Sequence, residues 1–300
     1  MFERKACVLA AACGALTVGT WAQTAPDIDT LLARVAGRIE QYYKLAQNVM
    51  CIEKTTVMRL GHNFETVGFH RVTEAELRVE SDSANRDTNG DGSKDGSAAP
   101  TFVRQLLRIN GRAPRDKDMK DRSTCLDPNP LTPEPLAFLL PTRREGYTFT
   151  SAGFGKGKDS AALVIEYTRA GSRRSELIDD PRGREDCFET SAPLAVKGRV
   201  LVDGTNYDVL RIEEHLAGLG ELRTSRTQQR THNFSPSIVV DRVDVTTRYR
   251  VVSFKDPEET FLLPESIETL EMYRAELQSH RTRQEFSNYR RFVTGGRVVK

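Results

Sequence analysis

The sequence has little of several features that mark specialised protein classes. It has one tryptophan, five cysteines and no excess of one charge, since Lys+Arg (44) nearly balances Asp+Glu (42). The even charge argues against nucleic acid as a partner. The overall composition is not that of a collagen-like, acidic-tail or low-complexity chain. The 300 residues are enough to bury a sizeable core, in one large domain or two small ones.

The common catalytic motifs are also absent. There is no G-x-S-x-G nucleophile elbow. The segment 153–159 approaches a phosphate-binding loop, but Ala152 stands where its first glycine belongs and Asp159 where a serine or threonine is needed. No histidine pair or cysteine pair has zinc-ligand spacing. We therefore expect no enzyme and no catalytic residue; a hydrolase using Cys51 would need a histidine and an electropositive setting.

The first 22 residues have the pattern of a secretory signal peptide. Arg4 and Lys5 precede an apolar run over 6–18, which is too short to span a bilayer, and Thr20-Trp21-Ala22 supplies small residues at a cleavage site. An N-terminal anchor or a lipoprotein site at Cys13 are the alternatives. Residues 23–300 contain no apolar run of about 18 residues, so no membrane span is expected after cleavage. The sequence thus predicts an exported protein, periplasmic or secreted.

Three cysteines remain after cleavage, and an oxidising compartment favours pairing two of them. Cys125 and Cys187 lie in polar, turn-rich sequence, whereas Cys51 follows an apolar stretch. We favour a Cys125–Cys187 disulfide with Cys51 as a buried free thiol, although spacing leaves all three pairings open.

The mature chain begins with an amphipathic helix pattern at 27–49 and then changes to a period of two. Apolar residues in 27–49 recur at i, i+3, i+4 and i+7. Alternating stretches follow, and Asp203-Gly204-Thr205-Asn206 has the composition of a hairpin turn between two of them. Several alternating stretches are 12–14 residues long, about 40–45 Å as strands. This pattern predicts a mainly β α+β protein, with a long curved antiparallel sheet forming a half-barrel under the N-terminal helix.

Two segments interrupt the strand pattern. Pro133–Pro141 is apolar, starts with prolines suited to a helix N-terminus and is too short to be stable alone, so we expect a short inner helix that plugs the concave side of the sheet. Residues 81–100 contain no large apolar residue and predict a solvated, mobile loop. No linker or repeat divides the chain, which predicts a single half-barrel domain over 23–300.

The loop at 81–100 also contains a weak calcium candidate. Asp87, Asn89, Asp91 and Asp95 follow the spacing at the start of an EF-hand loop. Ala98 stands where a bidentate carboxylate is required, and plain loops have the same Asp/Asn/Gly composition. No other cofactor is indicated.

In these features the chain resembles the extracytoplasmic lipoprotein carriers of the LolA/LolB family. The resemblance rests on the opening helix, Leu106–Arg112, the plug-like Pro133–Pro141, the hairpin Gly198–Glu213 and the closing strand Phe286–Phe292. The chain is also similar to uncharacterised secreted proteins of soil bacteria, which imply no activity. The loop at 81–100 and the cysteine-bearing stretch at 113–130 depart from the family pattern.

The resemblance implies a binding protein that holds a lipid, an acyl chain or a lipidated protein in the concave face of the sheet. The residues expected to line its cavity come from the plug and from one long strand: Leu136, Phe138, Leu139, Leu140, Val243, Val245, Tyr249 and Val251. Core packing is the alternative role for each of them. A sensor or scaffold that binds an envelope protein partner, with no small ligand, is the alternative function.

Overall fold

A computed structural model describes residues 26–46, 49–61, 63–80, 101–115, 135–156, 159, 161–172, 175–180, 187–255, 258–274 and 276–291. The signal peptide, the loop at 81–100 with its calcium candidate Asp87, Asn89, Asp91 and Asp95, and Cys125 lie outside these ranges. Export, the calcium site and the Cys125–Cys187 pairing therefore stay predictions.

The predicted N-terminal helix is present as α1 (Ile28–Ala46). Asp27 starts it, since its carboxylate accepts a hydrogen bond from the amide of Thr30 at 3.0 Å. Hydrogen bonds from the Thr30 side chain and from this amide lower the pKa of Asp27. The buried residues of α1 form one stripe of Leu31, Leu32, Val35, Ala36, Ile39 and Ala46, so one face of the helix packs on the rest of the molecule.

Among the described residues, the rest of the fold is dominated by one sheet of thirteen strands. In chain order these are β1 (Val49–Leu60), β2 (Thr66–Glu80), β3 (Thr101–Ile109), β4 (Tyr147–Phe154), β5 (Ala162–Arg169), β6 (Ser175–Asp179), β7 (Phe188–Thr190), β8 (Val196–Asp203), β9 (Val209–Leu216), β10 (Gly220–Arg223), β11 (Ser237–Lys255), β12 (Glu258–Arg274) and β13 (His280–Arg291). The short elements are the 3-10 helices η1 (Pro135–Leu139) and η2 (Pro141–Arg143) and the helix α3 (Arg226–Thr231).

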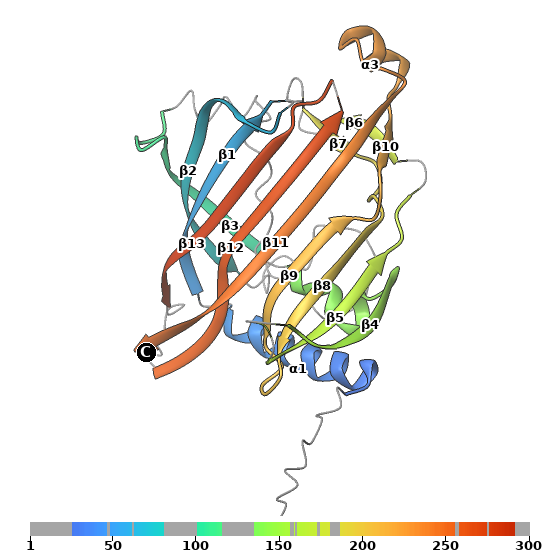
Figure 1. Ribbon diagram of the computed structural model, residues 1–300. Coiled ribbons are helices and arrows are strands. Elements are labelled where there is room, and N and C mark those ends of the chain that lie inside the picture. Colours follow the sequence, from blue (N-terminus) through green and yellow to red (C-terminus); the bar gives the residue numbers. More distant parts are fainter. Residues whose placement is uncertain are drawn as a thin grey trace, which may run out of the picture.

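The strand order along the main path is β3-β2-β1-β13-β12-β11-β9-β8-β5-β4, and its two end strands do not pair with each other. The sheet is therefore open, a curved half-barrel as the sequence predicts (Figure 1). Beside this path, β10 pairs antiparallel with β11 and parallel with β6, and β6 pairs in turn with β7. These strands and α3 lie at the opposite end of the sheet from α1 (Figure 1).

β1 is a strand that the sequence analysis did not identify. Its burial alternates, with Val49, Cys51, Glu53, Thr55 and Val57 all buried. Two of these five side chains are polar, so the stretch lacks the apolar alternation that normally reveals a half-buried strand. β1 nevertheless occupies a central place, because it pairs with β2 on one side and β13 on the other.

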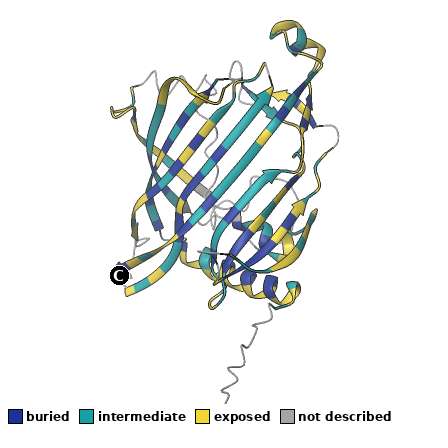
Figure 2. Cartoon of the chain, viewed as in Figure 1, coloured by how far each residue is buried: buried dark blue, intermediate teal, exposed yellow. Residues whose placement is uncertain are grey.

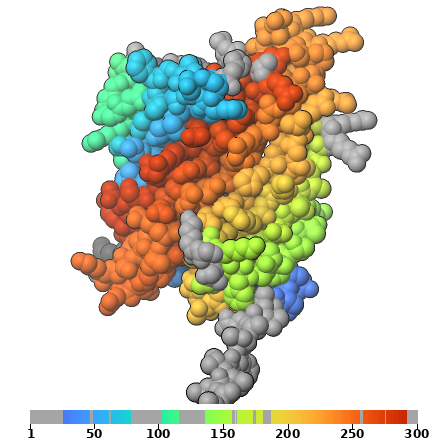
Figure 3. Space-filling view, viewed as in Figure 1, coloured from blue at the N-terminus to red at the C-terminus, as the bar shows by residue number. Residues whose placement is uncertain are grey.

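The two faces of the sheet differ in chemistry. The face turned away from α1 carries ion pairs between neighbouring strands, including Arg199–Glu213 at 2.5 Å and Arg248–Glu268 at 3.5 Å. In Figure 3 strands from β2 across to β5 follow one another over this face, and α1 is largely hidden behind them. Figure 2 shows the resulting alternation of buried and exposed positions along the long strands. This face is exposed to solvent, as the alternating sequence predicts.

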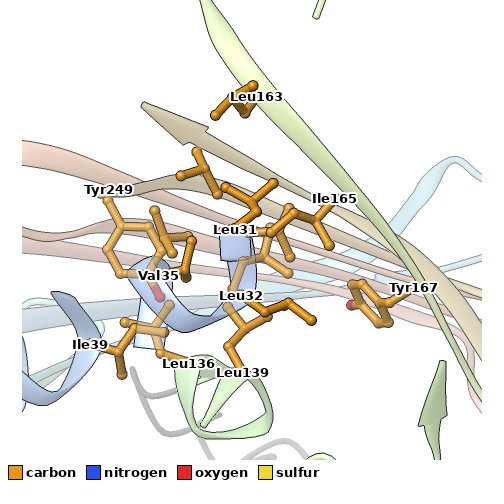
Figure 4. Close-up of a cluster of buried hydrophobic side chains, with 14 residues drawn as sticks. Leu31, Leu32, Val35, Ile39, Leu136, Leu139, Leu163, Ile165, Tyr167 and Tyr249 are labelled. Carbon is orange, nitrogen blue, oxygen red and sulfur yellow. The ribbon is translucent and has the colours of Figure 1, made fainter. Parts of the chain in front are cut away.

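The main core lies between α1, η1 and the inner face of β5, β8 and β9. Leu31 and Val35 of α1, Leu139 of η1, Ile165 of β5 and Val200 of β8 are all fully buried at 0% exposure. Figure 4 shows Leu136 and Leu139 gathered with the α1 side chains. The concave side is thus filled here by side chains, and the described part of the predicted plug is the 3-10 helix η1, with η2 starting at the plug's last residue, Pro141.

Arg144, which follows η2, ties the plug to the helix. Its guanidinium donates hydrogen bonds to the carbonyl oxygen of Leu139 at 2.7 Å and of Leu32 at 3.0 Å. Partial burial lowers the pKa of Arg144. The bond to Leu139 satisfies a carbonyl group at the end of the short turn η1, and the bond to Leu32 links this turn to α1, which helps to explain how so short an apolar segment stays in place.

Candidate functional site

The eight residues predicted to line a cavity do not all meet in one place. Leu139 belongs to the solid core under α1, and Leu140 packs half-buried against that core. Phe138 lies in a ring cluster with Tyr147 and Tyr167, at centroid distances of 5.1 and 4.8 Å. Their ligand-binding role stays a prediction, and the structure gives these three plug residues close protein neighbours.

The four residues predicted from the long strand share a face but not a cluster. Val243 packs with the group around Ile238, and Val245 packs with the group around Cys51 and Ile267. Tyr249 belongs to the α1 core, whereas Val251 is 66% exposed. From 243 to 251 the strand advances roughly 26 Å, so one face of so long a strand passes several different neighbourhoods.

Leu136, Tyr249 and Val251 do come together at an open cleft beside the C-terminal half of α1. The cleft has a volume of about 390 Å³, within the usual size range of ligand sites. Its lining comes from α1, η1, the start of β1, the β8–β9 hairpin and the β11–β12 hairpin: Arg38, Ile39, Gln41, Tyr42, Leu45, Ala46, Val49, Leu136, Asp203, Asn206, Asp208, Val209, Leu210, Tyr249, Val251, Thr260, Phe261, Leu262 and Leu263.

The floor of the cleft is apolar. Ile39, Leu136, Val209 and Leu263 line it with exposures of 5% or less. Tyr249 completes the floor from β11, and Figure 4 places its ring close to Ile39 and Val35. An apolar floor of this kind binds hydrocarbon by removing it from water, at about 25 cal/mol per Å² of buried surface.

One wall of the cleft is the turn between β8 and β9. The Asp203 carboxylate accepts hydrogen bonds from the amides of Thr205 at 2.8 Å and Asn206 at 3.1 Å. Tyr207 follows with φ +64°, a left-handed conformation that a tyrosine rarely adopts. This turn chemistry, which the sequence signalled as a hairpin, places Asp203, Asn206 and Asp208 along the cleft.

Two arginines of α1 hold the helix against this turn. Arg38 forms an ion pair with Asp208, with Nη2 and Oδ1 2.7 Å apart, and this hydrogen-bonded contact raises the pKa of Arg38. Arg34 bonds to the Tyr207 hydroxyl and lies over its ring at 5.0 Å from the centroid. The polar rim of the cleft is therefore organised before any ligand arrives.

A second group of buried polar residues lies on the inner face away from α1. Glu53 is 2% exposed and accepts hydrogen bonds from Arg104 at 2.6 Å and Gln284 at 2.6 Å. Cys51 lies two residues before Glu53 on the same face of β1, and it is a free buried thiol as predicted. Burial, followed by the charge of Glu53, raises the pKa of Cys51 to about 12. A thiol so strongly protonated is a poor nucleophile, and Cys51 has no catalytic setting.

Within the described ranges, no three His, Cys, Asp or Glu side chains are grouped so as to hold a metal ion. Over the same ranges, no helix has the length and apolar character needed to cross a membrane. Cys187 is buried beside β7.

Comparison with known proteins gave a structural similarity alone. No family model and no curated protein sequence matches the chain. Among solved structures, the chain is similar to a LolA superfamily protein from Nitrosomonas europaea. The two chains are 10% identical, the similarity covers 90% of this chain and 96% of the other, and the TM-score is 0.36. That protein is named for the family that the sequence resembles; similarity at this level assigns neither ligand nor activity to this chain.

Sequence reasoning missed most of the cleft. Arg38 and Gln41 look like ordinary solvent positions of an amphipathic helix, and Asp203 and Asp208 look like ordinary turn residues. Only the packing of α1 across the β8–β9 hairpin makes them neighbours. The apolar run Phe261-Leu262-Leu263 was a usable signal, because it breaks the strict alternation of a half-buried strand.

Proposed function

We propose that this protein is an exported binding protein that holds a lipid or another ligand with an apolar chain in the cleft beside α1. The observation that carries the proposal is a cleft of about 390 Å³ with a buried apolar floor and an exposed polar rim. The family resemblance of the sequence agrees with a lipid or lipidated protein as the ligand. Side chains fill the core under α1. We therefore assign the ligand to the cleft and not to the centre of the concave face of the sheet.

Native mass spectrometry of residues 23–300, secreted from cells and then extracted for lipid, tests the proposal. We expect either a bound lipid or uptake of an added single-chain amphiphile. Val251→Trp should block uptake, because residue 251 is exposed at the cleft and an indole there fills it with little effect on the core. Val103→Trp is the matched control, since Val103 is also an exposed strand valine, 39% exposed on β3 and away from the cleft.

Loss of uptake in the Val251→Trp variant but not in Val103→Trp would place the ligand in the cleft. A protein that carries no lipid and takes up none of the offered amphiphiles overturns the proposal. Equal uptake by both variants and the unchanged protein would also overturn the assignment to this cleft.

A protein partner is the second candidate, and one observation favours it. Near the turn between β1 and β2, Phe64, Val67 and Phe69 are 59%, 53% and 101% exposed. Gly68 has φ +75°, and residues 68–70 bulge from the pairing of β2 with β1, which turns Phe69 fully outward. Exposed apolar groups gathered in this way commonly mark contact surfaces.

Photo-crosslinking from position 67 in the native envelope tests this candidate. A defined partner that is lost in the Phe69→Ser variant, while cleft uptake stays unchanged, would support a scaffold function. The absence of any crosslinked protein, or a crosslink that is indifferent to Phe69→Ser, would remove it.

A further inference from the structure

The polar rim of the cleft has an uneven charge. Among the residues that line the cleft, Arg38 carries the one positive charge, and Asp203 and Asp208 carry two negative charges. The rim therefore has an excess of one negative charge, and its sign bears on which ligand head group can lie there.

The positive charge of Arg38 is already compensated. Its Nε and Nη2 both lie within 2.8 Å of Asp208 Oδ1, and its Nη1 donates to Gln41 Oε1 at 2.7 Å. A carboxylate or phosphate entering the cleft would have to displace Asp208 from Arg38. Displacement would leave Asp208, whose side chain is only 20% exposed, without its cation.

The charge of Asp203 is not compensated in this way. Its carboxylate bonds to the backbone amides of Thr205 and Asn206, which carry no net charge. Within the described part of the chain, no Lys, Arg or His side chain forms an ion pair with Asp203. The nearby Arg34 is directed to Tyr207 and is not part of the cleft lining.

We propose that the cleft selects single-chain amphiphiles by head-group charge, taking an amine or quaternary ammonium head in preference to an uncharged head, and an anionic head least. This inference rests on the proposed function and adds the chemical class of the ligand. The hydrocarbon chain lies on the floor formed by Ile39, Leu136 and Leu263, and the cationic head lies at the rim beside Asp203.

The test compares three probes with the same chain length, each kept below its critical micelle concentration: dodecyltrimethylammonium, monododecanoylglycerol and dodecanoate. Calorimetry on the full mature protein gives their dissociation constants. One exposed charge interaction is worth up to about 1 kcal/mol, so we expect each step in the series to weaken binding by about two- to fivefold. Raising the salt concentration should reduce the differences between the three dissociation constants, because salt screens the charge interaction.

Asp203→Asn isolates the charge, because the amide oxygen still accepts the two backbone hydrogen bonds of the turn. In this variant the preference for dodecyltrimethylammonium over dodecanoate should shrink by about two- to fivefold. Asp208→Asn should instead improve dodecanoate binding, since Arg38 then lacks its carboxylate. Asp241→Asn is the matched control: Asp241 pairs with Arg274 outside this cleft, and its loss should leave the order unchanged.

The outcomes separate the two proposals. If none of the three probes binds, the proposed function itself fails. If they bind and Val251→Trp blocks them, but their affinities are equal or dodecanoate binds best, the proposed function stands and the charge selection is wrong. An unchanged preference in Asp203→Asn would likewise contradict the role of Asp203.

Discussion

At the scale of single residues, a few buried polar side chains matter strongly for the stability of this fold. Glu53 and Gln284 are almost completely buried in the middle of the sheet, and the Glu53 carboxylate accepts hydrogen bonds from Gln284 and from Arg104, its ion-pair partner. A buried ion pair adds little net stability when intact, since desolvation offsets the attraction. Removing one member alone is nevertheless costly, because the groups left behind lose a charged partner that water cannot readily replace at a buried site.

Replacing Glu53 with alanine should therefore destabilise the protein severely. Gln284 and Arg104 lose their shared acceptor, and we expect the free energy of unfolding to fall by about 3–5 kcal/mol. Urea unfolding followed by circular dichroism measures this change. Glu285→Ala is the control, because its pair with Arg283 is exposed and should be worth less than about 1 kcal/mol. Similar losses in both variants would contradict the role given to burial.

Cys51 links stability to pH. Its thiol has a pKa of about 12 in the folded protein against 9.0 for the ordinary group. Between these values the unfolded chain loses a proton that the native state keeps, so raising the pH favours unfolding. The contribution of Cys51 is fully present below pH 9 and is lost as the pH rises toward 12, with a slope of up to about 1.4 kcal/mol per pH unit.

The difference in the free energy of unfolding between the unchanged protein and Cys51→Ala removes the contribution of groups that titrate alike in both proteins. We expect that difference to depend on pH above 9 and to be flat below it. The native thiol should also resist alkylation at neutral pH until denaturant is added. Rapid alkylation of the native protein would show that Cys51 is not buried as described.

At the scale of elements, close approach between strands explains one glycine. A Cβ atom on Gly198 in β8 would lie 2.4 Å from the carbonyl oxygen of Glu213 and 2.5 Å from the ring of Tyr167. The Tyr167 hydroxyl donates a hydrogen bond to Glu214 of the paired strand β9, at 3.0 Å. This bond restrains the Tyr167 ring, and the pairing of β8 with β9 restrains the Glu213 carbonyl group, so neither moves aside easily.

We expect Gly198→Ala to lower the free energy of unfolding by about 1–3 kcal/mol through overpacking. Gly218→Ala is the matched substitution, because a Cβ there meets nothing within 4 Å. Thermal unfolding of both variants measures the contrast. If the two variants unfold at the same temperature, the surroundings of Gly198 can accommodate a Cβ atom, and the overpacking argument is wrong.

The same scale shows what the sequence could and could not predict. The stripe on α1 and the Asp203 turn are local patterns, and both predictions are confirmed. β1 was missed because Glu53 and Thr55 interrupt its apolar alternation, and Glu53 is buried against partners more than 40 residues away, Arg104 and Gln284. The cleft was missed in most of its residues because it lies where α1 crosses a hairpin far along the chain. Contacts between distant segments leave no period in the sequence.

Over the whole molecule, the order of strands in space differs from their order in the chain. β13 lies between β1 and β12, so it joins the β1–β2–β3 part to the rest of the sheet. Deleting residues 280–300 should therefore unfold the protein instead of trimming an edge, and circular dichroism with hydrogen exchange would show loss of the sheet. A truncated chain that keeps its sheet and cooperative unfolding would contradict this prediction.

The position of β13 also sets the order of events during synthesis. The ribosome makes β1 long before β13, and about 220 residues separate these two strands, which must pair. Contacts between such remote segments form slowly, because the long intervening chain must close before they stabilise anything. The emerging chain therefore cannot complete its sheet until β13 has been made, and a chain whose sheet is incomplete is the form that can still pass through a narrow channel.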